Sequence, residues 1–201
     1  MDLELFYEFG SQYSYLSVML AEQAAKARGL SIAYRPFLLG PIFAAQGYSQ
    51  PPFKQFPIKG EYVWRDIERL CADAGLNFRR PTSFPRKGVL AARVALVGLD
   101  EGWGLAFSRR VYQLNFVEDR EIEDEANIRE VLAGLSLSAD TVLARALAPD
   151  NRERLKLQTQ RAQDLGIFGA PTFVVGRELF WGQDRMQQAL EWASRAREQA
   201  P

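Results

Sequence analysis

Two short segments near opposite ends of the chain carry residues that could perform chemistry on sulfur. The first, residues 9–15, follows an alternating apolar run and opens a helical pattern, so it brings the hydroxyl of Ser11 to the start of a helix. The second, residues 169–175, places Pro171 at the mouth of a run of β-branched and aromatic residues, which is typical of a strand. A hydroxyl at a helix start, opposite a strand led by proline, has the geometry of a thiol site. Ser11 stands where a redox protein carries cysteine, so we expect the thiol to come from a ligand.

The hydroxyl of Ser11 has two compatible roles. As a helix N-cap, either Ser11 or Ser14 would accept a hydrogen bond from a free backbone amide of the first turn. As a catalytic group, Ser11 would donate to a bound thiolate. A free thiol has a pKa of about 8.5 and is mostly protonated at neutral pH. A hydroxyl donor and the positive end of the helix dipole both favour the charged form, so together they would activate the sulfur of the ligand.

The dipeptide Ala170-Pro171 is the second element of this site. A proline at the start of a strand removes no ladder hydrogen bond, so an ordinary trans turn is one interpretation. The other is a cis peptide bond, which is rare except before proline. A cis bond would turn the backbone N–H and C=O of Ala170 into the cleft. There they would pair with an extended, peptide-like ligand, as an added strand does.

A third cluster, formed by Trp181, Gly182, Gln183 and Asp184, precedes the last predicted helix. Asp184 followed by Gln187 fits a capping box, which is a structural role. A helix N-terminus beside a cleft also binds anions through its free amides, and Asp184 would pair with an ammonium group. A free amino-acid end carries both charges. The γ-glutamyl group of glutathione is such an end.

Composition narrows the classes of chemistry. The 201 residues include 25 basic and 25 acidic side chains, so charge gives no case for binding nucleic acid. The single cysteine, Cys71, lies in a helical pattern as a packed thiol, and a lone cysteine excludes a CxxC redox pair. The absence of histidine excludes a Ser-His-Asp triad and imidazole metal sites, and we expect no bound metal. Apolar stretches are too short to span a bilayer and the first residues lack a secretory pattern, so we expect an intracellular protein that binds no membrane.

The order of predicted elements indicates an α/β fold in which strands at both ends flank a helical stretch. The elements expected at the two ends are a strand at 3–8, a helix at 13–28 and a strand at 31–36, then strands at 172–175 and 178–181 and a helix at 184–198.

The intervening stretch is helical by periodicity, with one exception. Residues 37–59 hold so many prolines and glycines that we expect an ordered loop there rather than a helix. The whole pattern predicts a thioredoxin fold, formed by residues 1–39 and 166–201, with a large inserted all-helical domain at 40–165. The cleft between the two parts is the expected ligand site.

Several motifs together resemble one known family. They are F-x-S-x-Y-S-Y-L at residues 9–16, R-P-F-L-L-G at 35–40, G-x-x-x-P-P at 47–52, P-I-K-G at 57–60, F-P at 84–85, F-G-A-P-T-F-V-V at 168–175 and the segment 179–185. On these motifs the chain resembles the 2-hydroxychromene-2-carboxylate isomerases. That family is related to the kappa-class glutathione transferases and, more remotely, to the DsbA oxidoreductases. The resemblance runs essentially end to end.

The resemblance implies a glutathione-dependent cis–trans isomerase. Its reaction interconverts 2-hydroxychromene-2-carboxylate and trans-o-hydroxybenzylidenepyruvate, or a related product of aromatic ring cleavage, during naphthalene breakdown. By this resemblance Ser11 is the catalytic residue that holds the sulfur of glutathione. Ala170 and Pro171 would bind the tripeptide backbone, and Trp181 through Asp184 would hold its γ-glutamyl end. The resemblance also implies a cytoplasmic homodimer.

The chain departs from the family pattern mainly in the substrate half of the site. Gln12 replaces the usual proline after the serine, Ala44 lies where relatives carry a lysine, Ser49 replaces an asparagine before the two prolines, and Arg86-Lys87 replaces an asparagine after Phe-Pro. Ser49, Lys59 and Lys87 are the candidates for binding a small aromatic carboxylate, with Arg86 or Lys87 supplying a missing cation. Two alternatives stay open: a kappa-like glutathione transferase that conjugates electrophiles, and a non-catalytic thioredoxin-fold binding module.

Overall fold

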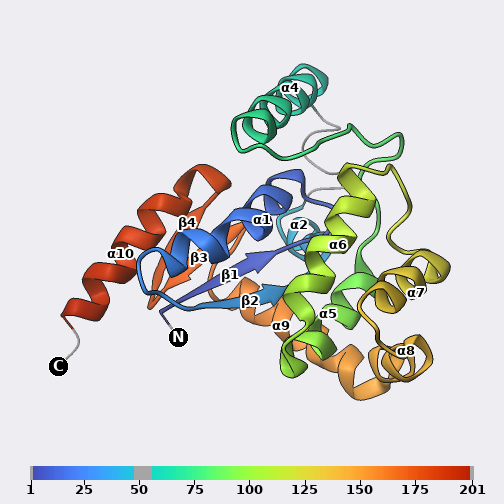
Figure 1. Ribbon diagram of the computed structural model, residues 1–201. Helices are drawn as coiled ribbons and strands as arrows, with labels where there is room; N and C mark the ends of the chain where they lie inside the picture. Colours follow the sequence, from blue (N-terminus) through green and yellow to red (C-terminus); the bar gives the residue numbers. More distant parts are fainter. Residues whose placement is uncertain (1, 48–55, 200–201) are drawn as a thin grey trace.

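The computed structural model describes residues 2–47 and 56–199, which form one four-stranded mixed sheet surrounded by helices (Figure 1). The strands are β1 (Leu3–Tyr7), β2 (Ile32–Pro36), β3 (Thr172–Val175) and β4 (Glu178–Trp181), in the spatial order β2-β1-β3-β4. β1 is parallel to β2 and antiparallel to β3, so Leu5 lies between Tyr34 and Phe173. The sheet joins strands from both ends of the chain, which confirms the predicted thioredoxin fold.

The central strands β1 and β3 carry buried apolar side chains on both faces, and helices cover both faces of the sheet. On one face Leu5, Tyr7 and Phe173 pack in a core with α1 (Gln12–Lys26) and α10 (Met186–Glu198). On the other face Phe6 and Val174 pack against α2 (Leu39–Ala45) and α9 (Pro149–Asp164). Alternation along each strand places successive side chains on opposite faces. A sheet covered in this way has buried strand ends at which a site can form.

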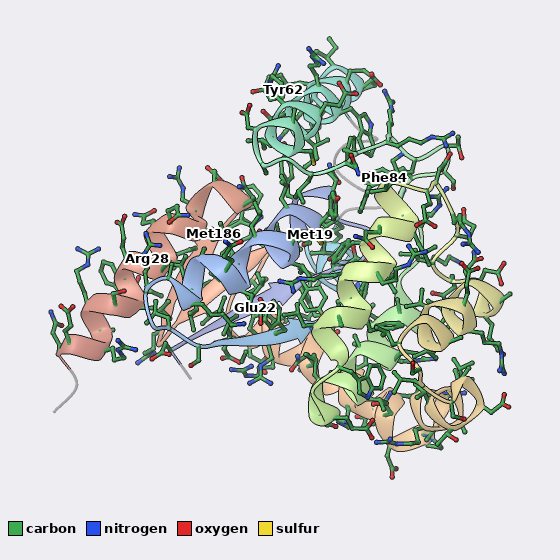
Figure 2. All side chains as sticks on the ribbon, viewed as in Figure 1. Met19, Glu22, Arg28, Tyr62, Phe84 and Met186 are labelled. Carbon is green, nitrogen blue, oxygen red and sulfur yellow. The ribbon has the colours of Figure 1, made fainter. Side chains whose placement is uncertain are left out.

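The remaining helices lie between β2 and β3 in the sequence. They are α4 (Pro57–Asp73), α5 (Val89–Glu101), α6 (Gly104–Phe116), α7 (Glu125–Gly134) and α8 (Ala139–Leu147). In Figure 1, α5 to α8 gather to the right of the sheet, α10 lies to its left, and α4 lies above α1. Figure 2 shows Tyr62 on α4 and Phe84 on the chain that leads from α4 toward the other helices. The main core is continuous from the sheet into these helices, and the predicted domain boundaries stay a prediction.

The predicted loop at residues 37–59 is wrong in part. Residues Leu39–Ala45 form α2, and α4 begins at Pro57. Both helices carry a proline in the first turn, at Pro41 and Pro57, where the backbone N–H has no intrahelical acceptor to lose. The prolines therefore mark helix starts rather than a continuous loop.

Two findings concern the described part of the chain as a whole. Within residues 2–47 and 56–199, no helix is long and apolar enough to cross a bilayer, and no group of acidic or cysteine side chains is arranged to hold a metal ion.

Cys71 is 1% exposed, and burial raises the pKa of its thiol to about 11. The thiol of Cys71 is therefore protonated at neutral pH and is an inert core group.

Candidate functional site

Ser11 caps the first helix, as the sequence predicts. Its backbone is extended, with φ −89° and ψ 118°, and its Oγ accepts a hydrogen bond from the backbone N–H of Ser14 at 3.2 Å. The same Oγ donates to the carbonyl oxygen of Ala170 at 3.0 Å. Ser11 keeps 9% of its surface exposed. The hydroxyl therefore sits where the start of α1 meets the strand led by proline.

The Ala170–Pro171 peptide bond is cis, one of the two conformations that the sequence left open. The carbonyl oxygen of Pro171 accepts the backbone N–H of Gly182 at 2.9 Å, which ties the start of β3 to the end of β4. Thr172 Oγ1 donates to the carbonyl of Gly169 at 2.9 Å and fixes the other side of the turn. These bonds hold the backbone around Ala170 at the end of the sheet that faces Ser11.

A cavity of about 470 Å³ opens beside this turn. Its walls are Tyr13, Asp66, Leu70, Ala170, Pro171, Trp181, Gly182, Gln183, Asp184 and Arg185. The cavity thus brings together all six residues expected to bind the peptide part of a ligand: Ala170, Pro171 and Trp181 through Asp184. Ser11 is not a wall residue and reaches the edge of the cavity through its bond to Ala170.

The Trp181 indole forms an aromatic wall of the cavity, and its position depends on the absence of a side chain at Gly169. A Cβ at Gly169 would lie 2.3 Å from Trp181 Nε1, so only glycine leaves room for the ring in this position. Phe168 contacts the indole with ring centroids 4.9 Å apart. Both rings are about half exposed. They form an apolar surface that is open to ligand and solvent.

The segment that follows Trp181 differs from the expected capping box. Residues Gln183–Arg185 form a short 3-10 turn, and α10 begins at Met186 without a side-chain cap. Gly182 adopts φ +109°, a conformation that favours glycine, and a Cβ there would lie 2.4 Å from Asp184 Oδ1. Asp184 therefore folds back over Gly182 instead of bonding the helix amides. Its carboxylate stays exposed at the cavity wall, 3.6 Å from the Arg185 guanidinium.

The opposite wall carries a second carboxylate that the sequence interpretation missed. Tyr13 donates from its hydroxyl to Asp66 Oδ2 at 2.8 Å, and Arg69 contacts Asp66 Oδ1 at 3.2 Å. Burial and the bond to Asp66 both raise the pKa of Tyr13, so its hydroxyl stays protonated. The cavity walls thus combine Asp66 and Asp184 with Arg185, an arrangement suited to a ligand with both an ammonium and a carboxylate. Of the residues in this wall, only Tyr13 belongs to a motif noted in the sequence, the one at residues 9–16.

The three predicted substrate residues do not join this cavity. Ser49 lies outside the described residues. Lys59 is exposed in the first turn of α4, and Lys87 is exposed after a second cis peptide bond, Phe84–Pro85; neither lines the cavity. Their role toward a substrate carboxylate stays a prediction.

Arg86 is a correction to the expectation of a substrate cation. Its side chain is 2% exposed, and its guanidinium donates to Asp119 Oδ1 at 2.6 Å, to Glu121 at 2.9 Å and to Asn115 at 3.1 Å. With these partners engaged and the side chain buried, Arg86 anchors the chain after Pro85 to the end of α6. It has a structural role.

Comparisons with known proteins agree with the thioredoxin fold described above. A family model described as a DsbA-like thioredoxin domain matches residues 2–191. The 2-hydroxychromene-2-carboxylate isomerase of Sphingobium xenophagum is 25% identical over 184 residues, covering 92% of this chain and 93% of the relative. Glutathione S-transferase kappa 1 of Rattus norvegicus is 27% identical over 203 residues, covering 92% and 87%. A solved structure of 2-hydroxychromene-2-carboxylate isomerase is similar with a TM-score of 0.88 at 22% identity, covering 98% of this chain and 96% of that chain.

Proposed function

The chain belongs to the family of DsbA-like thioredoxin domains, and on that premise we propose that it is a glutathione-dependent cis–trans isomerase. Its substrates would be 2-hydroxychromene-2-carboxylate and trans-o-hydroxybenzylidenepyruvate, or a related product of aromatic ring cleavage. The observation that carries the proposal is the Ser11 hydroxyl at a helix start, 3.0 Å from the carbonyl that precedes a cis proline. Relatives named for this isomerase and for a kappa glutathione transferase support it.

The residues at the cavity fit glutathione. Its γ-glutamyl end carries an ammonium and a carboxylate, which match the exposed carboxylate of Asp184 and the polar groups of Gln183 and Arg185. The tripeptide backbone matches the backbone of Ala170 beside Pro171. Position 182 has no space for a side chain, because Asp184 folds back over Gly182. These features form a cradle for a small zwitterionic peptide.

Ser11 would act on the thiol of that peptide. When bound, glutathione supplies a thiol that adds reversibly to the conjugated carbon of the substrate and so permits rotation about the former double bond. The Ser11 hydroxyl is already oriented as a donor, and the amino end of α1 adds its dipole. Both favour a charged sulfur over a protonated one. The lone Cys71 is buried, so this chain has no exposed thiol of its own for disulfide exchange.

The other half of the site would hold a small aromatic carboxylate. Lys59 is an exposed cation in the first turn of α4, and Lys87 is an exposed cation on the segment that follows α4. Either ammonium would pair with the carboxylate of the substrate and with negative charge that develops beside it. We propose that the enzyme acts as a cytoplasmic homodimer, as the family resemblance implies.

A kappa-like glutathione transferase is the second candidate. The 27% identity to glutathione S-transferase kappa 1 favours it. The two activities differ in the fate of glutathione. An isomerase releases it intact, whereas a transferase consumes it in a stable conjugate.

One assay separates these functions. The protein is incubated with glutathione and trans-o-hydroxybenzylidenepyruvate while the ultraviolet spectrum and the total free thiol are followed. The isomerase predicts a spectral change that needs glutathione, with free thiol constant over many turnovers. A stoichiometric loss of thiol would instead support the transferase. Glutathione binding without either change would support a binding module and reject the proposal.

A further inference from the structure

Glu8 lies at the exit of β1 and makes contacts along the whole turn that presents Ser11. Its carboxylate Oε2 accepts the backbone N–H of Gly10 at 2.9 Å, and its carbonyl oxygen accepts the backbone N–H of Ser11 at 3.0 Å. Its own N–H donates to Ser14 Oγ at 3.4 Å, and the hydroxyl of Tyr112 donates to its carbonyl at 2.9 Å. One residue thus bonds the residue before Ser11, Ser11 itself and the first turn of α1.

The turn has little freedom to adopt another shape. A Cβ at Gly10 would lie 2.9 Å from the carbonyl oxygen of Arg86, and a Cβ at Gly88 would lie 2.7 Å from Phe9 Cβ. The chain at residues 86–88 therefore presses directly on the turn, and the partly exposed Glu8 carboxylate lies beside Gly88. Because two backbones pack this closely, loss of the Glu8 acceptor would leave the Gly10 N–H without its partner in a crowded place.

The surroundings of the Glu8 carboxylate provide no compensating cation among the described residues. From α6 comes Tyr112, whose hydroxyl bonds the carbonyl of Glu8 rather than its carboxylate. From residues 86–88 come Arg86, whose guanidinium is turned to Asp119, and Lys87, which is exposed. From α1 comes the uncharged Ser14. Burial raises the pKa of Glu8 to about 7, and the Gly10 N–H opposes that rise only in part.

We propose that Glu8 is a positioning residue of the thiol site, whose carboxyl fixes the turn that presents Ser11 and whose protonation favours a bound thiolate. The proposal rests on the proposed function, because it needs a thiol at Ser11. Fixing the turn requires only an oxygen acceptor. The preference for thiolate follows from charge: a carboxylate that is bonded to Gly10, the residue before Ser11, repels a second anion, and a neutral carboxyl does not. By linkage, a bound thiolate in turn makes Glu8 harder to ionise.

Three variants distinguish the two roles of the Glu8 carboxyl, as a hydrogen-bond acceptor for the Gly10 N–H and as a negative charge. Glu8→Gln keeps an oxygen for the Gly10 N–H but cannot ionise, Glu8→Ala removes both, and Glu153→Gln on α9 is the control on the opposite face of the sheet. Glutathione affinity is measured by calorimetry from pH 5.5 to 8.5. Glu8→Gln should bind like the wild type at pH 5.5 and about fivefold more tightly at pH 8.5. Glu8→Ala should bind more weakly at every pH, and Glu153→Gln should match the wild type.

A second measurement requires no glutathione. Carbon-detected NMR of the free protein should show one glutamate that titrates near pH 7 and is missing from the Glu8→Gln spectrum. Titration of Glu8 near its ordinary value of 4.5, or equal affinity of wild type and Glu8→Gln across the pH range, would overturn the inference while glutathione binding itself stands. A wild type that binds no glutathione rejects the proposed function first and the inference with it. Circular dichroism of Glu8→Ala confirms that any loss of binding occurs in folded protein.

Discussion

The Ser11 hydroxyl donates to the Ala170 carbonyl oxygen at 3.0 Å and so joins the start of α1 to the cis-proline turn. A hydroxyl has one proton to donate, so Ser11 cannot serve both this carbonyl and a bound sulfur. A ligand that takes the proton leaves Ala170 without its donor, and the amide of a peptide ligand can replace it. In the proposed function, recognition of a peptide backbone and activation of a thiol would therefore be coupled through these two residues.

We first predict the effect of Ser11→Ala on two related ligands. Glutathione should bind about tenfold more weakly, because a hydrogen bond to a charged group contributes about 1.5 kcal/mol. S-methylglutathione, which has no ionisable thiol, should lose much less affinity. Calorimetry gives both affinities, and the ultraviolet absorbance of bound thiolate should disappear in the variant. An equal loss for both ligands would show that Ser11 does not act on the sulfur.

A matched control for this variant is Ser138→Ala. Ser138 caps α8 by accepting the backbone N–H of Thr141, as Ser11 caps α1 with Ser14. Each variant should lose about 1 kcal/mol of unfolding free energy through its cap, but only Ser11→Ala should change glutathione binding. Weaker binding in Ser138→Ala would attribute the effect to general stability.

A second prediction concerns the aromatic wall. Gly169→Ala places a methyl group against the Trp181 indole, so the ring must leave its position. Glutathione affinity should fall several-fold, and tryptophan fluorescence should shift toward that of a solvated indole. Gly134→Ala at the end of α7 is the control, because the added methyl group meets no atom within 4 Å. It should stabilise the fold by about 0.5 kcal/mol and leave glutathione affinity and tryptophan fluorescence unchanged. Unchanged fluorescence in Gly169→Ala would refute the packing of Trp181 on this glycine.

Asp184 gives the third prediction. Its side chain is 70% exposed, so a pair with a ligand ammonium is well screened, and Asp184→Asn should weaken glutathione binding only about two- to fivefold. Glutathione that lacks its amino group should bind the wild type and the variant equally. Asp73→Asn, at the exposed end of α4, serves as the control. If Asp184→Asn also weakens the deaminated ligand, the carboxylate does not read the ammonium.

Local patterns were sufficient to predict one half of the site. Ser11 lies at a helix start and Ala170 and Pro171 precede a strand, where strand and turn signals fix the backbone within a few residues. The strands then pair in the order β2-β1-β3-β4, which joins both ends of the chain. The other half was not predictable in this way. Tyr13 and Asp66 are 53 residues apart, and their contact depends on how α4 packs over α1, for which the sequence carries no local signal.

Two further differences between prediction and structure have separate physical reasons. Prolines predicted a loop at residues 37–59, but the first turn of a helix accepts proline, so α2 and the start of α4 could form there. Arg86 carries a charge that suggests a ligand site. Its burial against Asp119, which follows α6, became visible only when distant segments were brought together. Charge alone does not reveal whether a side chain faces solvent.

The fourth prediction is that Glu8 makes stability depend on pH. Its pKa is raised from 4.5 to about 7 in the folded protein, so the folded state binds the proton more tightly than the unfolded state does. Glu8 therefore supports the fold below about pH 4.5, and this support is lost as pH rises through about 7. The wild type should lose about 2 kcal/mol of unfolding free energy between pH 5 and pH 8 relative to Glu8→Gln, a value reduced for its partial exposure. Urea unfolding at both pH values measures it, and parallel curves for the two proteins would contradict the assignment.

The last prediction separates two neighbouring cations. Arg86→Ala leaves Asp119 buried, with 7% of its side chain exposed, and without its closer cationic partner, so the fold should lose about 3 kcal/mol. Lys87→Gln should leave the free energy of unfolding unchanged, because its side chain is exposed. In the isomerase assay Lys87→Gln should raise the KM of the carboxylate substrate several-fold with little change in kcat. Folded Arg86→Ala should keep the wild-type KM. The reverse pattern, with KM raised only in Arg86→Ala, would show that the buried guanidinium rather than the exposed ammonium reads the substrate.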